Sequence, residues 1–80
     1  MDVRRLVGTN FARLRRERGL TQEQVEERSG FSQQYLSGLE RGQRNPTLAT
    51  LQQVARALGV GTLDLLEGID TVEPGEGRDG

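Results

Sequence analysis

The sequence predicts an all-α protein of five short helices, and three observations support this class. Apolar residues recur at helical spacing, glycine and capping residues separate the helical segments, and no alternating run of β-branched residues marks a strand. The 80 residues allow one small domain, because a chain of this size buries only about 60% of the surface that its unfolded form exposes.

The first predicted helix occupies the segment before Gly19. Apolar side chains at Leu6, Phe11 and Leu14 follow a helical repeat. Gly19 can adopt the left-handed conformation that ends a helix, and Leu20 can then fold back on the last turn. The arginines of this segment fall mainly on its other faces.

The second and third predicted helices, at about residues 22–29 and 33–41, are separated by a glycine turn. The letters "TQEQ" indicate a capping box between Thr21 and the glutamine three residues later. Gly30 suits a turn that needs a positive φ, and Ser32 is a good N-cap. Helix, glycine turn and helix are the layout of a DNA-reading helix-turn-helix motif.

A fourth helix follows the loop "GQRNP", and a last turn or two completes the domain. Thr47 is expected to cap the fourth helix and Gly59 to end it, while Thr62 is expected to cap the fifth. The buried stripe of the fourth helix is expected to consist of Leu48, Leu51, Val54, Ala55 and Leu58.

Charge is distributed unevenly, although the formal net charge is only −1. Residues 1–20 carry six arginines and two acidic residues, and residues 61–80 carry one arginine and six acidic residues. We therefore expect a mildly basic domain over residues 1–68 and a short, disordered acidic tail over 69–80. Such a domain can attract phosphate, but charge alone does not establish that it does.

Composition argues against several classes of protein. Cysteine and histidine are absent, so we expect no disulfide, metal site or cofactor. The chain has neither an apolar run of about 20 residues nor the apolar centre of a signal peptide, so we expect a cytoplasmic protein without membrane contact. An enzyme is disfavoured, since no paired carboxylates share a predicted face. No small-molecule ligand is expected.

One long segment of the chain resembles the lambda-repressor-like family of bacterial and phage regulators, also called the Cro or XRE family. The segment is residues 19–60, "GLTQEQVEERSGFSQQYLSGLERGQRNPTLATLQQVARALGV". With "RLRRERG" before it and "LDLLEG" after it, the resemblance covers about residues 4–68. It joins several spaced signals, among them "YLS", "LERG", "NP" and "ALGV". The resemblance implies a compact five-helix DNA-binding domain.

The resemblance also implies that the third helix enters the major groove with its N-terminal residues facing base edges. Gln33 and Gln34 match base-reading positions, and Ser37 lies one turn further on a similar face. A glutamine amide offers a donor and an acceptor that match adenine N6 and N7. The alternative is that the two glutamines only solvate an exposed helix end.

Further residues are implied to contact the sugar-phosphate backbone, which fixes register rather than sequence. Gln22 begins the second helix, where backbone N–H groups favour an anion; its alternative role is in the local cap. For each arginine the alternative is a solvated charged face. The implied set is Asn10, Gln22, Ser32, Gln43, Arg44 and Asn45.

Arg15 and Glu40 match a family pair that links the first helix to the end of the third. Two positions depart from the family. Glu26 stands where alanine is usual, and it could swing outward, pair with Arg41 or widen the helix crossing. Gly38 stands on the groove-facing side of the third helix, where many relatives carry a longer polar residue. The DNA opposite Gly38 is either read with fewer side-chain contacts, or a thymine methyl group comes close to the glycine.

The implied partner is double-stranded DNA, bound by a homodimer on a palindromic operator with half-sites about 10 bp apart. The preferred hypothesis is a sequence-specific transcriptional regulator, most often a repressor. The alternative is an antitoxin or another protein-interaction module that binds DNA secondarily. The candidates for the dimer interface, which could equally complete the monomer core, are Leu63, Leu65, Leu66 and Ile69.

RNA polymerase is a further candidate partner. Glu23, Glu26 and Glu27 form an acidic group on the second predicted helix. The resemblance implies that such a face can touch the polymerase, and the alternative is a solvated acidic face.

Overall fold

The computed structural model describes residues 2–69, so most of the predicted acidic tail lies outside the described residues. This part of the chain folds into four α-helices and one 3-10 helix and contains no strand. The all-α class is confirmed, but the fifth element is a 3-10 helix. The elements are α1 (Val3–Glu17), α2 (Gln22–Ser29), α3 (Gln33–Glu40), α4 (Leu48–Leu58) and η1 (Thr62–Leu66).

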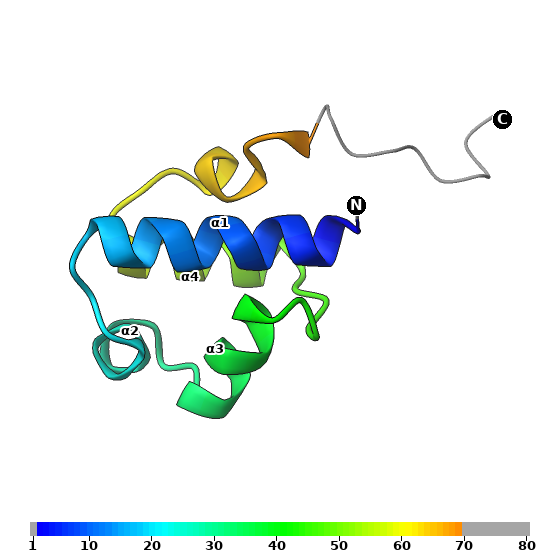
Figure 1. Cartoon of the computed structure of the whole chain (residues 1–80). Coiled ribbons are helices and arrows are strands. Elements are labelled where there is room, and N and C mark those ends of the chain that lie inside the picture. Colours follow the sequence, from blue (N-terminus) through cyan, green and yellow to red (C-terminus); the bar gives the residue numbers. More distant parts are fainter. Residues whose placement is uncertain (1, 70–80) are drawn as a thin grey trace, which may run out of the picture.

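Helix α1 lies in the middle of the fold (Figure 1). The pair α2 and α3 lies on one side of α1, η1 lies on the opposite side, and α4 runs behind α1 in this view. Helix α1 contacts α3 and η1, and α4 contacts α2 and η1. None of the described helices combines the length and apolar character that crossing a membrane requires.

Every element contributes to a single core. One side chain from each is 0% exposed: Phe11 from α1, Val25 from α2, Leu36 from α3, Val54 from α4 and Leu65 from η1. Burial of a side chain of this size contributes about 1.5–3 kcal/mol relative to leaving it exposed. The core therefore ties α2 and α3 to the rest of the domain.

The helix ends show why the elements stop and start where they do. Gly19, Gly30 and Gly59 have φ angles of +69°, +84° and +75°, in the region that glycine enters without a Cβ penalty. The capping box at the start of α2 is present. Thr21 Oγ1 accepts from the Gln24 N–H at 3.1 Å, and Gln24 Oε1 accepts from the Thr21 N–H at 2.8 Å.

One helix start differs from expectation. Thr62, predicted as a cap, is the first residue of η1, and Gly61 is the cap; the Asp64 carboxylate accepts the Gly61 N–H at 2.8 Å. Asp2 caps α1 by accepting the Arg4 N–H at 2.9 Å. Hydrogen bonds from the Arg4 side chain and backbone lower the pKa of Asp2 below its usual value.

Candidate nucleic-acid interface

The N-terminal end of α3 presents Gln33 and Gln34 to solvent. Ser32 caps the helix, and its hydroxyl oxygen accepts the Tyr35 N–H at 3.1 Å. Both glutamine side chains are exposed, and neither makes a hydrogen bond within residues 2–69. Their amide donors and acceptors are therefore free for a partner outside the domain.

The opposite face of α3 is fixed by packing. Leu36 and Leu39 are at most 1% exposed. Tyr35 is half-buried, and its ring centre lies 5.2 Å from that of Phe31. Because one face is anchored and the other is open, the exposed side chains of α3 start from a fixed backbone.

Arg15 and Glu40 form a largely buried ion pair, as the sequence predicted. Arg15 Nε donates to Glu40 Oε2 at 2.6 Å, and the two side chains are 14% and 12% exposed. A second nitrogen of the same guanidinium donates to the Leu20 carbonyl at 2.8 Å. One side chain therefore connects α1, the turn before α2 and the C-terminal end of α3.

Gly8 brings the backbones of α1 and α3 close together. A Cβ at this position would overlap the Leu39 carbonyl oxygen and lie 2.8 Å from the Glu40 carbonyl oxygen. The sequence pattern did not predict this contact. Its one available signal was a glycine in the interior of a predicted helix, which often marks close packing.

Asn10 was expected at the DNA backbone, and this expectation is wrong. Its side chain is 6% exposed. Asn10 Nδ2 donates to the carbonyl oxygens of Leu65 and Glu67, both at 2.9 Å. These partners lie on the η1 side of α1, away from α2 and α3 (Figure 1). Asn10 therefore holds η1 and the following residue to α1.

Gln22 and the loop after α3 lie at the surface. Gln22 is half-buried at the first position of α2, and its side chain makes no hydrogen bond within the described residues. It therefore takes no part in the local cap, which uses Thr21 and Gln24. Gln43, Arg44 and Asn45 are exposed and follow the end of α3, so they remain in position to contact a ligand of α3.

The outward side of Gly38, expected either to be read with fewer contacts or to be approached by a thymine methyl, is covered. Gly38 is buried, and the Arg44 side chain lies over it. The Arg44 guanidinium carbon is also 5.3 Å from the centre of the Tyr35 ring. A loop side chain therefore covers the place where a side chain from residue 38 would stand.

Glu26 does not pair with Arg41. Glu26 is half-buried and forms no ion pair within residues 2–69. Arg41 instead donates to Ser37 Oγ at 3.2 Å and to Gln43 Oε1 at 3.4 Å. Helices α2 and α3 remain in contact, so the glutamate is accommodated without separating them.

The dimer candidates divide between the core and the surface. Leu65 is 0% exposed, so it completes the monomer core, which was the alternative to a place in the dimer interface. Leu66 is half-buried against the same core. Leu63 and Ile69 are 79% and 43% exposed. Leu63 and Ile69 are therefore available for an apolar contact with a partner.

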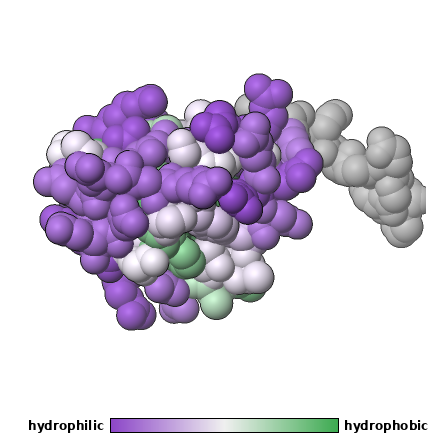
Figure 2. All heavy atoms as spheres, turned by 90° about the horizontal axis from the view of Figure 1, so that it is seen from below, coloured by the Kyte–Doolittle hydropathy of each residue, from purple (hydrophilic) through white to green (hydrophobic). Residues whose placement is uncertain are grey.

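The surface on the side of α2 and α3 is mainly hydrophilic, with a small apolar area (Figure 2). Leu48, at the start of α4, was expected in the buried stripe of that helix, and this expectation is wrong, because 75% of its surface is accessible. Interfaces with DNA are more polar than those between proteins, and the polar character of this face agrees with that property.

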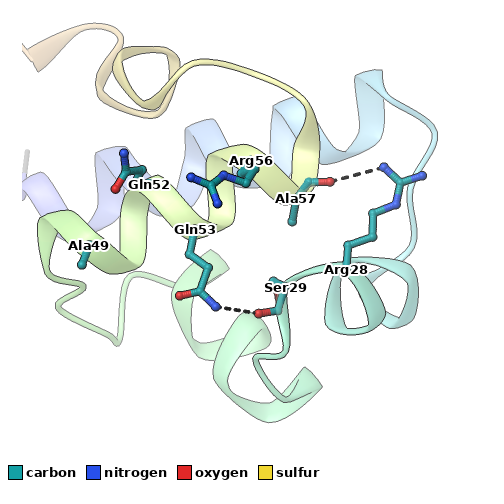
Figure 3. Close-up of a pocket in the computed structure, with 7 residues that line it drawn as sticks. All are labelled: Arg28, Ser29, Ala49, Gln52, Gln53, Arg56 and Ala57. Atoms are coloured by element: carbon teal, nitrogen blue, oxygen red, sulfur yellow. Dashed lines mark hydrogen bonds between the residues drawn. The ribbon is translucent and has the colours of Figure 1, made fainter.

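A groove between α2 and α4 is crossed by two hydrogen bonds (Figure 3). Gln53 Nε2 donates to the Ser29 carbonyl at 2.8 Å, and an Arg28 guanidinium nitrogen donates to the Ala57 carbonyl at 3.3 Å. Both bonds attach the C-terminal end of α2 to α4, so we assign the groove a structural role. Its lining residues are Arg28, Ser29, Ala49, Gln52, Gln53, Arg56 and Ala57.

The chain is similar to known regulators in sequence and in structure. The HTH_3 (helix-turn-helix) family model matches residues 11–65. The uncharacterized HTH-type transcriptional regulator y4dJ of Sinorhizobium fredii is 69% identical over 70 residues, which cover 88% of this chain and 91% of that protein.

Two solved structures of restriction-modification controller proteins share the fold. C.AhdI from Aeromonas hydrophila is 35% identical, with a TM-score of 0.74 over 78% of this chain and 94% of that one. C.Esp1396I, solved as a tetramer in complex with its natural 35 base-pair operator, is 28% identical. Its TM-score is 0.77, over 89% of this chain and 93% of that one.

Proposed function

Because the chain belongs to the HTH_3 helix-turn-helix family of lambda-repressor-like DNA-binding proteins, we propose that it is a transcriptional repressor. It binds a palindromic operator as a homodimer and recognises the sequence with α3. The observation that carries this proposal is the pair of exposed, unpartnered amides of Gln33 and Gln34 at the capped end of an anchored helix.

Base recognition is assigned to Gln33, Gln34 and Ser37. Each glutamine can pair with adenine N6 and N7, which discriminates against a wrong base by about 1–3 kcal/mol. Ser37 Oγ accepts from Arg41, and its hydroxyl proton remains available to a base acceptor.

Backbone contacts are assigned to residues around α3. At the start of α2, the Gln22 side chain and the unpaired backbone N–H groups favour a phosphate. The Ser32 hydroxyl keeps its donor after capping α3, and Gln43 and Asn45 add amides from the loop. Arg44 adds a positive charge that no described carboxylate neutralises.

A homodimer doubles the number of base contacts. C.Esp1396I, the similar controller protein, is a tetramer on its operator. In this chain the exposed Leu63 and Ile69 on the η1 side of α1 are the apolar residues that we assign to the two-fold contact, with Leu66 beside them.

Selection of bound sequences from a random duplex pool tests the proposal. The wild type is expected to enrich a palindrome, and Gln33→Ala to relax the preference at one position of each half-site by about 1–3 kcal/mol. Gln52→Ala is the matched control, because Gln52 is an exposed glutamine on α4. Failure of the wild type to enrich any sequence would contradict the proposal.

A further inference from the structure

Arg44 comes from the loop after α3 but lies against α3 itself. A Cβ at Gly38 would be 3.0 Å from Arg44 Nε and 3.3 Å from Arg44 Cγ. Both the stem and the guanidinium end of the side chain therefore pass over Gly38. The guanidinium carbon then lies 5.3 Å from the centre of the Tyr35 ring.

This path places Arg44 on the exposed face of α3. Gly38 is four residues after Gln34, so the two share one face of the helix. Side chains of a helix lean toward its N-terminus, and Arg44 runs in that direction, from Gly38 to Tyr35. Arg44 therefore occupies the space that a long side chain of residue 38 would occupy.

The surroundings hold the guanidinium without using its donors. The face of Tyr35 attracts the cation, and Tyr35 is itself packed against Phe31. The Arg44 side chain makes neither an ion pair nor a hydrogen bond within residues 2–69. Its five N–H donors therefore remain available to a partner outside the described residues.

We propose that Arg44 reads a guanine in the major groove and replaces the base-reading side chain that Gly38 lacks. The planar guanidinium fork matches guanine O6 and N7. This inference rests on the proposed function, because it takes α3 as the helix that enters the groove. It reassigns Arg44 from the phosphate backbone, where the sequence had placed it, to a base edge.

The test compares base preferences position by position in sequences selected from a random duplex pool. The wild type is expected to prefer guanine at one position of each half-site by about 5- to 150-fold, the range for one bidentate pair. Arg44→Ala removes this preference and leaves the others. Gly38→Met also removes it, since the new side chain fills the space over α3 while every charge is retained.

Three controls separate base reading from charge and folding. Arg56→Ala removes one positive charge from α4 and is expected to weaken binding to all sequences similarly. Tyr35→Phe retains the ring face and is expected to retain the guanine preference. Circular dichroism and thermal melting check that Gly38→Met keeps the helical fold, so that its altered preference reports on Arg44.

The outcomes distinguish the inference from the function on which it rests. If Arg44→Ala and Gly38→Met keep the guanine preference and lose only overall affinity, Arg44 contacts phosphate and the inference is wrong. A wild-type site without a preferred guanine also overturns it. If the wild type enriches no sequence, the proposed function fails, and the inference fails with it.

Discussion

Gly8 and Gly38 are both interior to helices, yet they meet different surroundings. Each costs its helix about 0.5–1 kcal/mol relative to alanine. Gly8 faces the carbonyl oxygens of Leu39 and Glu40, which belong to the backbone of α3, whereas Gly38 faces the flexible side chain of Arg44. A backbone cannot yield as a long side chain can, so the same substitution has opposite consequences at the two positions.

Gly8→Ala is expected to lower the free energy of unfolding by about 1–3 kcal/mol, the usual cost of overpacking. Gly38→Ala is the matched control, and it is expected to leave stability unchanged or raise it by up to about 1 kcal/mol. Urea denaturation measures both variants. A Gly8→Ala protein as stable as the wild type would show that α1 and α3 do not approach as closely as described.

The Arg15–Glu40 pair is the second link between α1 and α3. Arg15→Met and Glu40→Gln are each expected to lower the free energy of unfolding by about 1.5–3 kcal/mol, because each leaves a largely buried partner poorly compensated. The double variant is expected to lose less than the two single losses combined. Additive losses in urea denaturation would argue against a direct interaction.

At the scale of the element, α3 depends on its neighbours at both ends. A helix of eight residues is too short to be stable alone in water. The turn at Gly30 and the Ser32 cap fix its start, while Gly8 and the Arg15–Glu40 pair fix its end. The direction of the exposed glutamines is therefore a tertiary property.

Asn10→Ala tests the connection between α1 and η1. We expect a loss of about 1–3 kcal/mol in the free energy of unfolding, because two carbonyl oxygens lose their buried donor. The selected operator and the salt dependence of binding are expected to match those of the wild type, since Asn10 faces away from α3. If the variant folds normally but its affinity for DNA falls less steeply with salt than that of the wild type, Asn10 contacts the DNA backbone.

The sequence predicted the elements better than the contacts between distant ones. Caps and glycines act within a few residues, so the predicted helices at 22–29 and 33–41 nearly coincide with α2 and α3. The role of Asn10 depends on a carbonyl 57 residues away, which local pattern cannot specify. The position of Arg44 over Gly38 likewise depends on the loop conformation, which no periodicity predicts.

At the scale of the whole molecule, α1 separates two surfaces with different chemistry. The α2 and α3 side is mainly hydrophilic (Figure 2), whereas the η1 side carries the exposed Leu63 and Ile69. The proposed DNA contact and the proposed dimer contact therefore lie on opposite sides of α1 and do not compete for one surface.

Leu63→Asp is expected to convert the proposed dimer to a monomer and to weaken operator binding by roughly 100-fold or more, because linked half-sites then bind separately. Melting temperature is expected to stay near that of the wild type, since Leu63 is 79% exposed. Leu48→Asp, at 75% exposure, is the matched control for mass and melting temperature. Sedimentation in the absence of DNA gives the mass, and a dimeric Leu63→Asp protein would place the interface elsewhere.

The contact at Gly8 joins backbone to backbone, and this has a consequence for engineering. The contact that holds α3 at Gly8 involves the backbone at Leu39 and Glu40 and none of the outward side chains at positions 33, 34 and 37. New side chains grafted there would retarget the protein to another operator while the scaffold stayed the same. If the outward residues of another regulator's recognition helix were grafted onto a chain with alanine in place of Gly8, α3 would lie at a different tilt. The grafted residues would then no longer recognise their own operator.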